Sequence, residues 1–169
     1  MRWASFYALL TLLLLMEGHG LARSETTIVG TWKLVSWYLT DPEGDKSYPF
    51  GPSPAGQLIY TANGQMSAQL MRPGATLPND LTLNGPEAAE AVFSNLYFGY
   101  YGTYSMEGNT VSHHVEGSLV TTWIGTDLVR EFRFIDPDTV EITATMQGDA
   151  ASAAAGIDGK TVLIWERIR

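Results

Sequence analysis

Two short motifs near opposite ends of the chain constrain its fold most. Gly30-Thr31-Trp32 opens the first strand-like segment after an apolar leader, and Arg167 follows Trp165 in the last such segment. A Gly-x-Trp near the start and an arginine on the last strand predict a closed antiparallel barrel. In such a barrel the first and last strands pair, and the guanidinium can stack on the indole at one end. A small barrel encloses an interior that can hold one small molecule.

The rest of the chain follows an all-β pattern of short apolar–polar alternation between turn residues. Asn63-Gly64, for example, is typical of a tight hairpin. The segments expected to form strands are 27–39, 57–61, 65–71, 98–106, 110–116, 128–135, 139–146 and 160–169. Hairpin connections between neighbours predict a single up-and-down antiparallel barrel of about eight to ten strands. Because no run of helices is available to cover such a sheet, the sheet must cover itself by closing.

One segment departs from the strand pattern. Pro86 stands where a helix tolerates proline best, and residues 87–97 carry apolar side chains at helical spacing. We therefore expect one short mid-chain helix across an end of the barrel. It could serve as a plug or a lid, or only seal the core.

The first 22 residues have the features of a secretion signal. A basic start is followed by the apolar run from Ala8 to Met16 and by the small residues around Ala22. We expect a signal peptide over 1–22, cleaved after Ala22, and one barrel domain over 23–169. The apolar run is shorter than the ~20 residues that a membrane-spanning helix needs, although an uncleaved anchor is the alternative. We expect an exported protein, periplasmic or secreted, with no stable membrane insertion after the leader is removed.

Composition narrows the possible partners. The 169 residues include no cysteine, so the barrel is held by its core and its hydrogen-bonded sheet, without disulfides. The formal net charge of −8 argues against nucleic acid or an anionic membrane surface as a partner. With those partners disfavoured, we expect a small hydrophobic molecule as the partner. The sequence does not indicate an oligomeric state.

The two histidines of the expected domain are adjacent. His113 and His114 belong to one expected strand, so their side chains face opposite sides of the sheet and cannot readily share a metal ion. We expect neither a metal nor a cofactor. One imidazole should point into the barrel, where it either handles a proton of a ligand or is a neutral group satisfied by a tyrosine or a carbonyl. Which of the two faces inward stays open.

Arg130 shares a face with Phe132 and needs either a carboxylate partner or a polar ligand. Glu116 could supply an internal ion pair, and a bound carboxylate or carbonyl is the alternative. Tyrosine offers an apolar wall with a polar tip, and methionine adapts to irregular shapes, although both are also ordinary core residues. The candidate ligand-binding residues are Tyr60, Met66, Tyr101, His113, Arg130 and Phe132, and the candidate catalytic residues are His113 and His114. The sequence contains no Gly-x-Ser-x-Gly motif, so this signal does not predict a serine nucleophile.

Several stretches, taken in order, resemble the lipocalin-like domain family of bacteria and fungi. They are Gly30-Thr31-Trp32-Lys33-Leu34-Val35-Ser36, Pro49-Phe50-Gly51-Pro52, Gly56-Gln57-Leu58-Ile59-Tyr60-Thr61, Gly64-Gln65-Met66-Ser67-Ala68, Met71-Arg72-Pro73, Tyr101-Gly102-Thr103-Tyr104, 111–118 and 125–130. The similarity runs from about Ile28 to the C-terminus. It implies a calycin-type barrel with an interior cavity.

Three functions fit these observations. The first is an exported protein that binds a small, mainly apolar molecule in the barrel interior. The second is a cofactor-independent isomerase or cyclase in the same cavity, with His113 or His114 as the acid–base group and Arg130 or a tyrosine polarising an oxygen. The third is a structural or interaction module whose barrel is filled by its own side chains.

Overall fold

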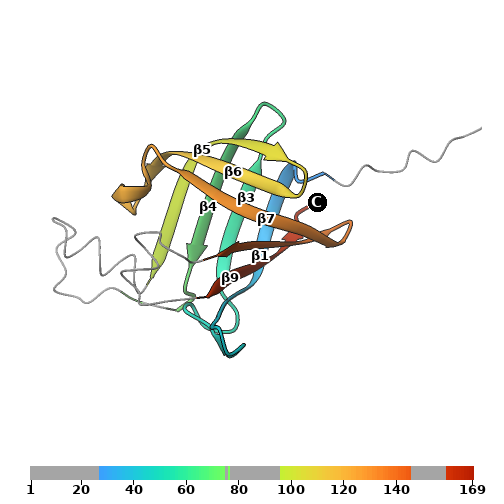
Figure 1. Ribbon diagram of the computed structural model, residues 1–169. Helices are drawn as coiled ribbons and strands as arrows, with labels where there is room; N and C mark the ends of the chain where they lie inside the picture. The colour runs from blue at the N-terminus through green and yellow to red at the C-terminus, as the bar shows by residue number, and fades with distance from the viewer. Residues whose placement is uncertain (1–26, 75, 77–95, 146–158) are drawn as a thin grey trace, which may run out of the picture.

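The computed structural model describes residues 27–74, 76, 96–145 and 159–169, and nearly all of them belong to strands or tight turns (Figure 1). The strands are β1 (Gly30–Thr40), β2 (Lys46–Ser47), β3 (Ala55–Tyr60), β4 (Gln65–Met71), β5 (Tyr97–Glu107), β6 (Thr110–Ser118), β7 (Asp127–Asp136), β8 (Thr139–Thr145) and β9 (Lys160–Arg167). A short 3₁₀ turn, η1 (Thr121–Trp123), lies between β6 and β7. No helix among the described residues has the length and apolarity needed to cross a membrane.

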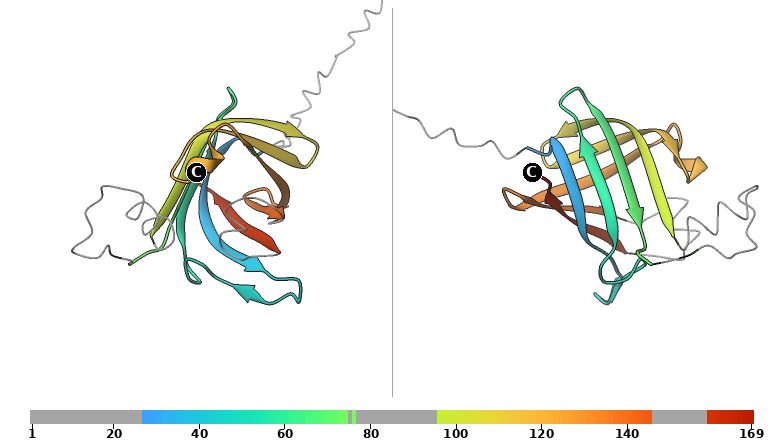
Figure 2. Two further views of the ribbon diagram at one scale, coloured as in Figure 1. Left: turned by 60° about the vertical axis from the view of Figure 1, so that its left-hand side comes forward. Right: turned by 180° about the vertical axis from the view of Figure 1, so that it is seen from behind.

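The strands form one antiparallel sheet that closes on itself. Each strand from β3 to β9 pairs with the next, β1 pairs with β3, and β1 also pairs with β9 (Figures 1 and 2). β2 adds two residues to the far end of β1, where Leu39 pairs with Ser47. The expected all-β, up-and-down barrel is confirmed, with β1 and β3–β9 as its wall. Closure leaves each strand of the wall with one inner and one outer face.

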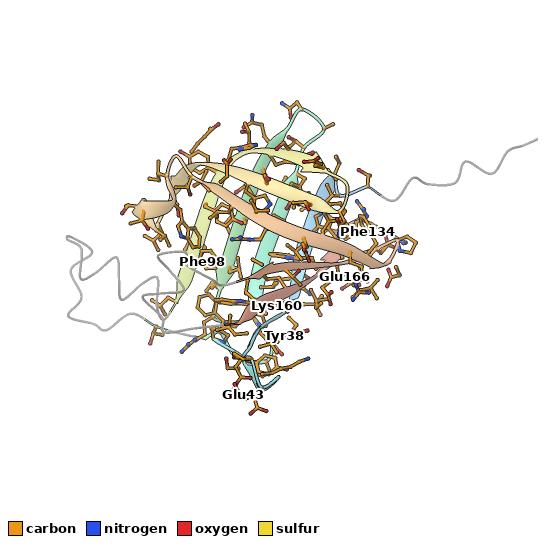
Figure 3. The ribbon with its side chains drawn as sticks, viewed as in Figure 1. Tyr38, Glu43, Phe98, Phe134, Lys160 and Glu166 are labelled. Carbon is orange, nitrogen blue, oxygen red and sulfur yellow. The ribbon has the colours of Figure 1, made fainter. Side chains whose placement is uncertain are left out.

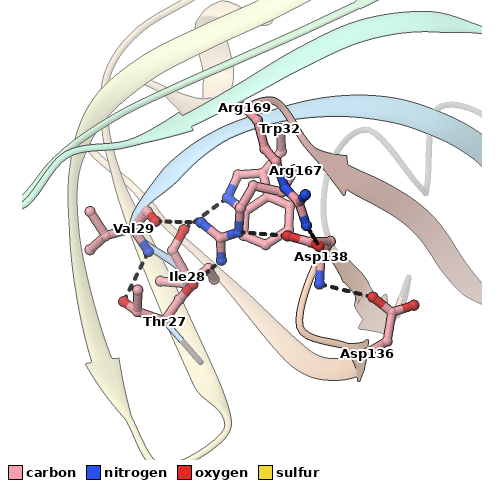
Figure 4. A network of polar contacts seen from close by, with 8 residues as sticks. All are labelled: Thr27, Ile28, Val29, Trp32, Asp136, Asp138, Arg167 and Arg169. Atoms are coloured by element: carbon pink, nitrogen blue, oxygen red, sulfur yellow. Dashed lines mark hydrogen bonds and ion pairs between the residues drawn. The ribbon is translucent and has the colours of Figure 1, made fainter. Parts of the chain in front are cut away.

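The closing contact joins Arg167 of β9 to the start of β1 (Figure 4). Its guanidinium carbon lies 4.1 Å from the centre of the Trp32 ring, so the expected cation–π stack is confirmed. The guanidinium also donates to Val29 O at 2.9 Å and to Thr27 O at 2.6 Å. The Trp32 indole donates to Ile28 O at 2.8 Å. The chain entering β1 is thereby tied to the last strand.

Gly30 is glycine because the Arg167 stack leaves no room for a side chain. A Cβ at this position would lie 2.6 Å from Arg167 Nη1, closer than atoms approach without displacement. Its φ of 144° also falls in the range that favours glycine. The Gly-x-Trp motif and the distant arginine are therefore parts of one packing unit.

The interior is filled by apolar and aromatic side chains that differ in how completely they are buried. Near Arg167, the inward side chains of Trp32 and Trp165 are 0% and 2% exposed. Farther along the barrel, Trp37, Phe98 and Phe132 pack against the core but are only partly buried. Phe98 and Phe134 lie on opposite sides of the barrel in the view of Figure 3. Phe134, whose ring centre lies 6.2 Å from that of Trp32, is also partly buried, so inward rings keep some exposure at more than one place in the barrel.

Several expectations need correction or lie outside the described residues. The sequence did not predict β2 or η1, and the helix expected over 87–97 lies almost wholly within residues that the structure does not describe. Its expected last residue, Tyr97, instead begins β5. The leader also lies outside the described residues.

We predict that Arg167→Met destabilises the protein by about 2 kcal/mol. The change leaves two backbone carbonyls without their donor and removes the cation–π contact. Arg133→Met is the matched control, because that arginine is 65% exposed and pairs with Glu141 at 3.0 Å on the outer face. It should cost less than about 1 kcal/mol. Urea unfolding of both variants measures the difference, and equal losses would refute a closing role for Arg167.

Candidate functional site

The centre of the inner face holds a buried histidine between two tyrosines. His113 on β6 is 2% exposed, and the choice that the sequence left open is settled in its favour. The Tyr60 hydroxyl on β3 lies 2.6 Å from His113 Nε2, and the Tyr100 hydroxyl on β5 lies 2.8 Å from Nδ1. Both ring nitrogens therefore have partners, which makes this a satisfied buried imidazole.

Burial keeps all three groups neutral at physiological pH. Burial, with smaller contributions from the charge of Arg130 and from His114, lowers the pKa of His113 to about 3. Burial also raises the pKa of Tyr60 well above its ordinary value and raises the pKa of Tyr100. The desolvated site disfavours every charged form, imidazolium and phenolate alike.

The cluster of His113, Tyr60 and Tyr100 has one polar hydrogen more than its internal hydrogen bonds use. A neutral imidazole and two phenols carry three polar hydrogens, and the two contacts to His113 use only two of them. The distance of 2.6 Å fits a hydroxyl donor, so we assign Tyr60 as the donor to Nε2 and Nδ1–H as the donor to the Tyr100 oxygen. The hydroxyl hydrogen of Tyr100 then stays available for another acceptor.

Arg130 brings a positive charge to the same place. It lies on β7 with a partly buried side chain, opposite the fully buried Val111 of β6. Its charge and a side-chain hydrogen bond lower the pKa of Tyr100 against the effect of burial. Its Nη1 donates to Val129 O at 3.0 Å.

No carboxylate neutralises this arginine within the part of the chain that the structure describes. The ion pairs found there are made by His114, Arg133, Arg167 and Arg169. Glu116, the internal partner considered from the sequence, is exposed, so that ion pair is not formed. Arg130 therefore presents an uncompensated charge toward Tyr100.

An aromatic group next to Tyr100 adds one more donor. The Trp123 ring meets the rings of Tyr100 and Phe98 edge-on, with centroids 5.8 Å away in both cases. Its Nε1 is buried and has no hydrogen-bond partner among the described residues. A buried indole N–H normally finds an acceptor, so this orphan donor marks a place where a ligand atom would be stabilised.

The remaining candidates divide between the two faces. Met66 is 3% exposed and lies inside, opposite Tyr60, and Phe132 shares the inner face with Arg130. Tyr101 is 58% exposed on the outer face and does not join this group. Tyr100 takes the inward place instead. The alternation of Phe98, Tyr100 and Tyr104 against Thr103 and Ser105 could have indicated this.

His114 lies on the outer face. Its Nε2 is 2.9 Å from Ser105 Oγ, and its Nδ1 is 2.7 Å from Asp127 Oδ1. The two histidines thus have separate environments, and neither contacts the other's partners. The described residues contain no group of three or more histidine, aspartate or glutamate side chains arranged to hold a metal ion.

Comparison with known proteins assigns the class. The model of the lipocalin-like domain family matches residues 29–168, so this chain belongs to that family. A lipocalin-like protein from Bacteroides uniformis ATCC 8492 is 11% identical, with a TM-score of 0.43 over 83% of this chain and 97% of that one. A redesigned β-barrel is 10% identical, with a TM-score of 0.40 over 83% and 91% of the two chains. No curated protein matches the chain.

We predict that His113 makes the fold less stable as the pH falls. The pKa of His113 is about 3 in the folded protein, against an ordinary value of 6.5. Between these values only the unfolded chain takes up the proton, so stability is lost on acidification across this window, by roughly 1 kcal/mol per pH unit. Urea unfolding at several pH values should show a shallower slope for His113→Gln.

Nuclear magnetic resonance of the unmodified protein checks the same point without a variant. The His113 ring resonances should keep their neutral positions well below pH 6.5, because Tyr60, Tyr100 and Arg130 surround an imidazole that burial keeps uncharged. A midpoint at the ordinary histidine pKa would contradict the prediction.

Proposed function

We propose that the protein is an exported carrier that encloses a small, mainly apolar molecule bearing a carboxylate or another acceptor-only group. The observation that carries this proposal is the charge of Arg130, which lies on the inner face beside Tyr100 without a carboxylate partner among the described residues. An arginine on a largely apolar inner face is stabilised when an anion or a strong acceptor pairs with it.

The polar end of such a ligand would meet several donors together. The Arg130 guanidinium can donate two parallel hydrogen bonds to a carboxylate. The spare hydroxyl hydrogen of Tyr100 and the unpartnered Nε1 of Trp123 lie in the same neighbourhood. All three groups donate, which favours a carboxylate or carbonyl over a hydroxyl or an amine.

The apolar body of the ligand would lie against the partly buried aromatic side chains of the inner face. Trp37 and Phe132 are only partly buried, so part of each ring could contact a ligand. Burial of apolar area contributes about 25 cal/mol per Å² before the costs of association are subtracted. The remaining exposure of these rings also favours a carrier over a module whose barrel is filled by its own side chains.

A cofactor-independent isomerase or cyclase is the second candidate. His113 would be its acid–base group, and Tyr100 or Arg130 would polarise a substrate oxygen. A general base works best with a pKa near the operating pH, and the pKa of His113 is about 3. This imidazole is a weak proton acceptor at neutral pH, so the site is better suited to binding than to general-base catalysis. With His113→Gln, an enzyme would lose turnover while still binding, whereas a carrier would change only in affinity.

We predict that Arg130→Met weakens binding of dansyl-undecanoic acid about tenfold or more. A hydrogen bond to a charged group is worth about 1.5–3 kcal/mol, and this bond would be lost. The methyl ester of the same probe keeps a carbonyl acceptor but lacks the charge, so Arg130→Met should weaken its binding by a smaller factor than that of the acid. Arg133→Met, three residues along β7 on the outer face, is the control and should leave the affinity for the acid unchanged. Energy transfer from tryptophan to dansyl measures each dissociation constant.

Two results would count against the carrier. If neither acid nor ester binds, the apolar interior is not a binding site. If both bind and Arg130→Met changes neither, the carrier remains but the carboxylate end is assigned wrongly.

Export is the untested part of the proposal and has its own measurement. If the leader is cleaved after Ala22, the intact mass of protein isolated from its own cells should correspond to a chain beginning at Arg23. Native mass spectrometry of the same sample would show any small molecule retained by the barrel. A mass that includes residues 1–22 would refute cleavage.

A further inference from the structure

Ser105, His114 and Asp127 form a hydrogen-bonded chain on the outer face of the barrel. Ser105 Oγ lies 2.9 Å from His114 Nε2, and His114 Nδ1 lies 2.7 Å from Asp127 Oδ1. These contacts join a hydroxyl, an imidazole and a carboxylate in the order used by serine nucleophiles. None of the three takes part in the proposed interior site.

The register of three neighbouring strands brings these residues together. His114 of β6 pairs directly with Asp127 of β7, and on its other side with Thr103 of β5. Ser105 lies two residues beyond Thr103 on the same face, which is the diagonal position that a long side chain can reach. The His114 and Asp127 side chains are 40% and 62% exposed, and Ser105 is exposed, so a substrate in solution can approach.

We propose that Ser105 is a nucleophile that accepts an acyl group from activated esters. The Asp127 carboxylate accepts from Nδ1–H and holds that tautomer, which leaves the Nε2 lone pair directed at Ser105. Nε2 can then remove the hydroxyl proton as the oxygen attacks. The exposed apolar side chain of Val129, two residues beyond Asp127 on the same face, offers a contact for an aryl group.

The reaction is an acyl transfer followed by hydrolysis. Ser105 Oγ forms a bond to the ester carbonyl carbon while its proton passes to His114 Nε2. The bond between that carbon and the aryloxy oxygen breaks, and the aryl oxide leaves and takes up the proton. Water then attacks the acyl-serine, which releases the carboxylic acid and restores the hydroxyl.

Activated aryl esters are the expected substrate class because the described contacts supply a nucleophile, a base and an orienting carboxylate only. Among the described residues, they place no further donor near Ser105 Oγ to stabilise the ester carbonyl oxygen, which carries the negative charge of the tetrahedral intermediate. Such donors are worth a factor of 10² to 10³ in rate, so amides and alkyl esters should react too slowly to detect.

The test uses p-nitrophenyl acetate with the full-length protein. We expect release of p-nitrophenol, and peptide mapping of the acid-quenched protein should locate the acetyl group on Ser105. Ser105→Ala and His114→Gln should each lower the rate at least about tenfold, and Asp127→Asn should lower it by a smaller factor, in keeping with general-base assistance. Ser112→Ala is the control, because Ser112 pairs with Ser105 across the strands but is not among the hydrogen-bond partners described for His114, so its rate should not change.

Two outcomes would overturn the proposal. An unchanged rate in Ser105→Ala would mean that His114 reacts directly, and acetyl groups found only on lysines or the N-terminus would mean that Ser105 is not activated. Peptide mapping of the wild-type protein does not depend on the folding of any variant, and thermal unfolding of each variant identifies a folding defect.

Discussion

The antiparallel pairing of β1 with β9 is the interaction on which the rest of the structure depends. An open sheet of these strands would expose two unpaired edges and an apolar face, whereas closure pairs the edges and encloses the face. The stack of Arg167 on Trp32 secures the junction and ties the incoming chain to it. Closure also turns the simple alternation of each strand into a division between inside and outside.

That division separates two kinds of chemistry that lie next to each other in the sequence. Inside, desolvation keeps His113 neutral between two phenols. Outside, the neighbouring His114 lies between a hydroxyl and a carboxylate and is exposed to solvent. A neutral, donor-rich interior suits recognition of an acceptor, while an accessible imidazole with an orienting carboxylate suits proton removal from a hydroxyl. The same residue type serves either purpose according to the face on which it lies.

In the proposed carrier, one charge would define the class of ligand. Apolar walls alone would accept many molecules of similar size. Arg130 changes this, because its charge lies beside Tyr100 with no described carboxylate to offset it. A ligand that supplies the missing anion would gain a charge-assisted hydrogen bond, and one that lacks it would cover the guanidinium without offsetting its charge. Selectivity would therefore come from the cost of the wrong ligand as much as from the fit of the right one.

The sequence by itself determined the strands, most of the hairpins and the closure, because period-two alternation and turn residues are local signals. It also determined the Trp32–Arg167 stack and the inward face of Arg130. It could not decide between His113 and His114, and although alternation along 98–105 favours Tyr100 over Tyr101 for the interior, the sequence alone does not prove it. Only the tertiary structure decided these positions and the approach of Ser105 to His114. Cross-strand neighbours depend on register, which hairpins and bulges such as the shift at Tyr101/Gly102 set across the sheet.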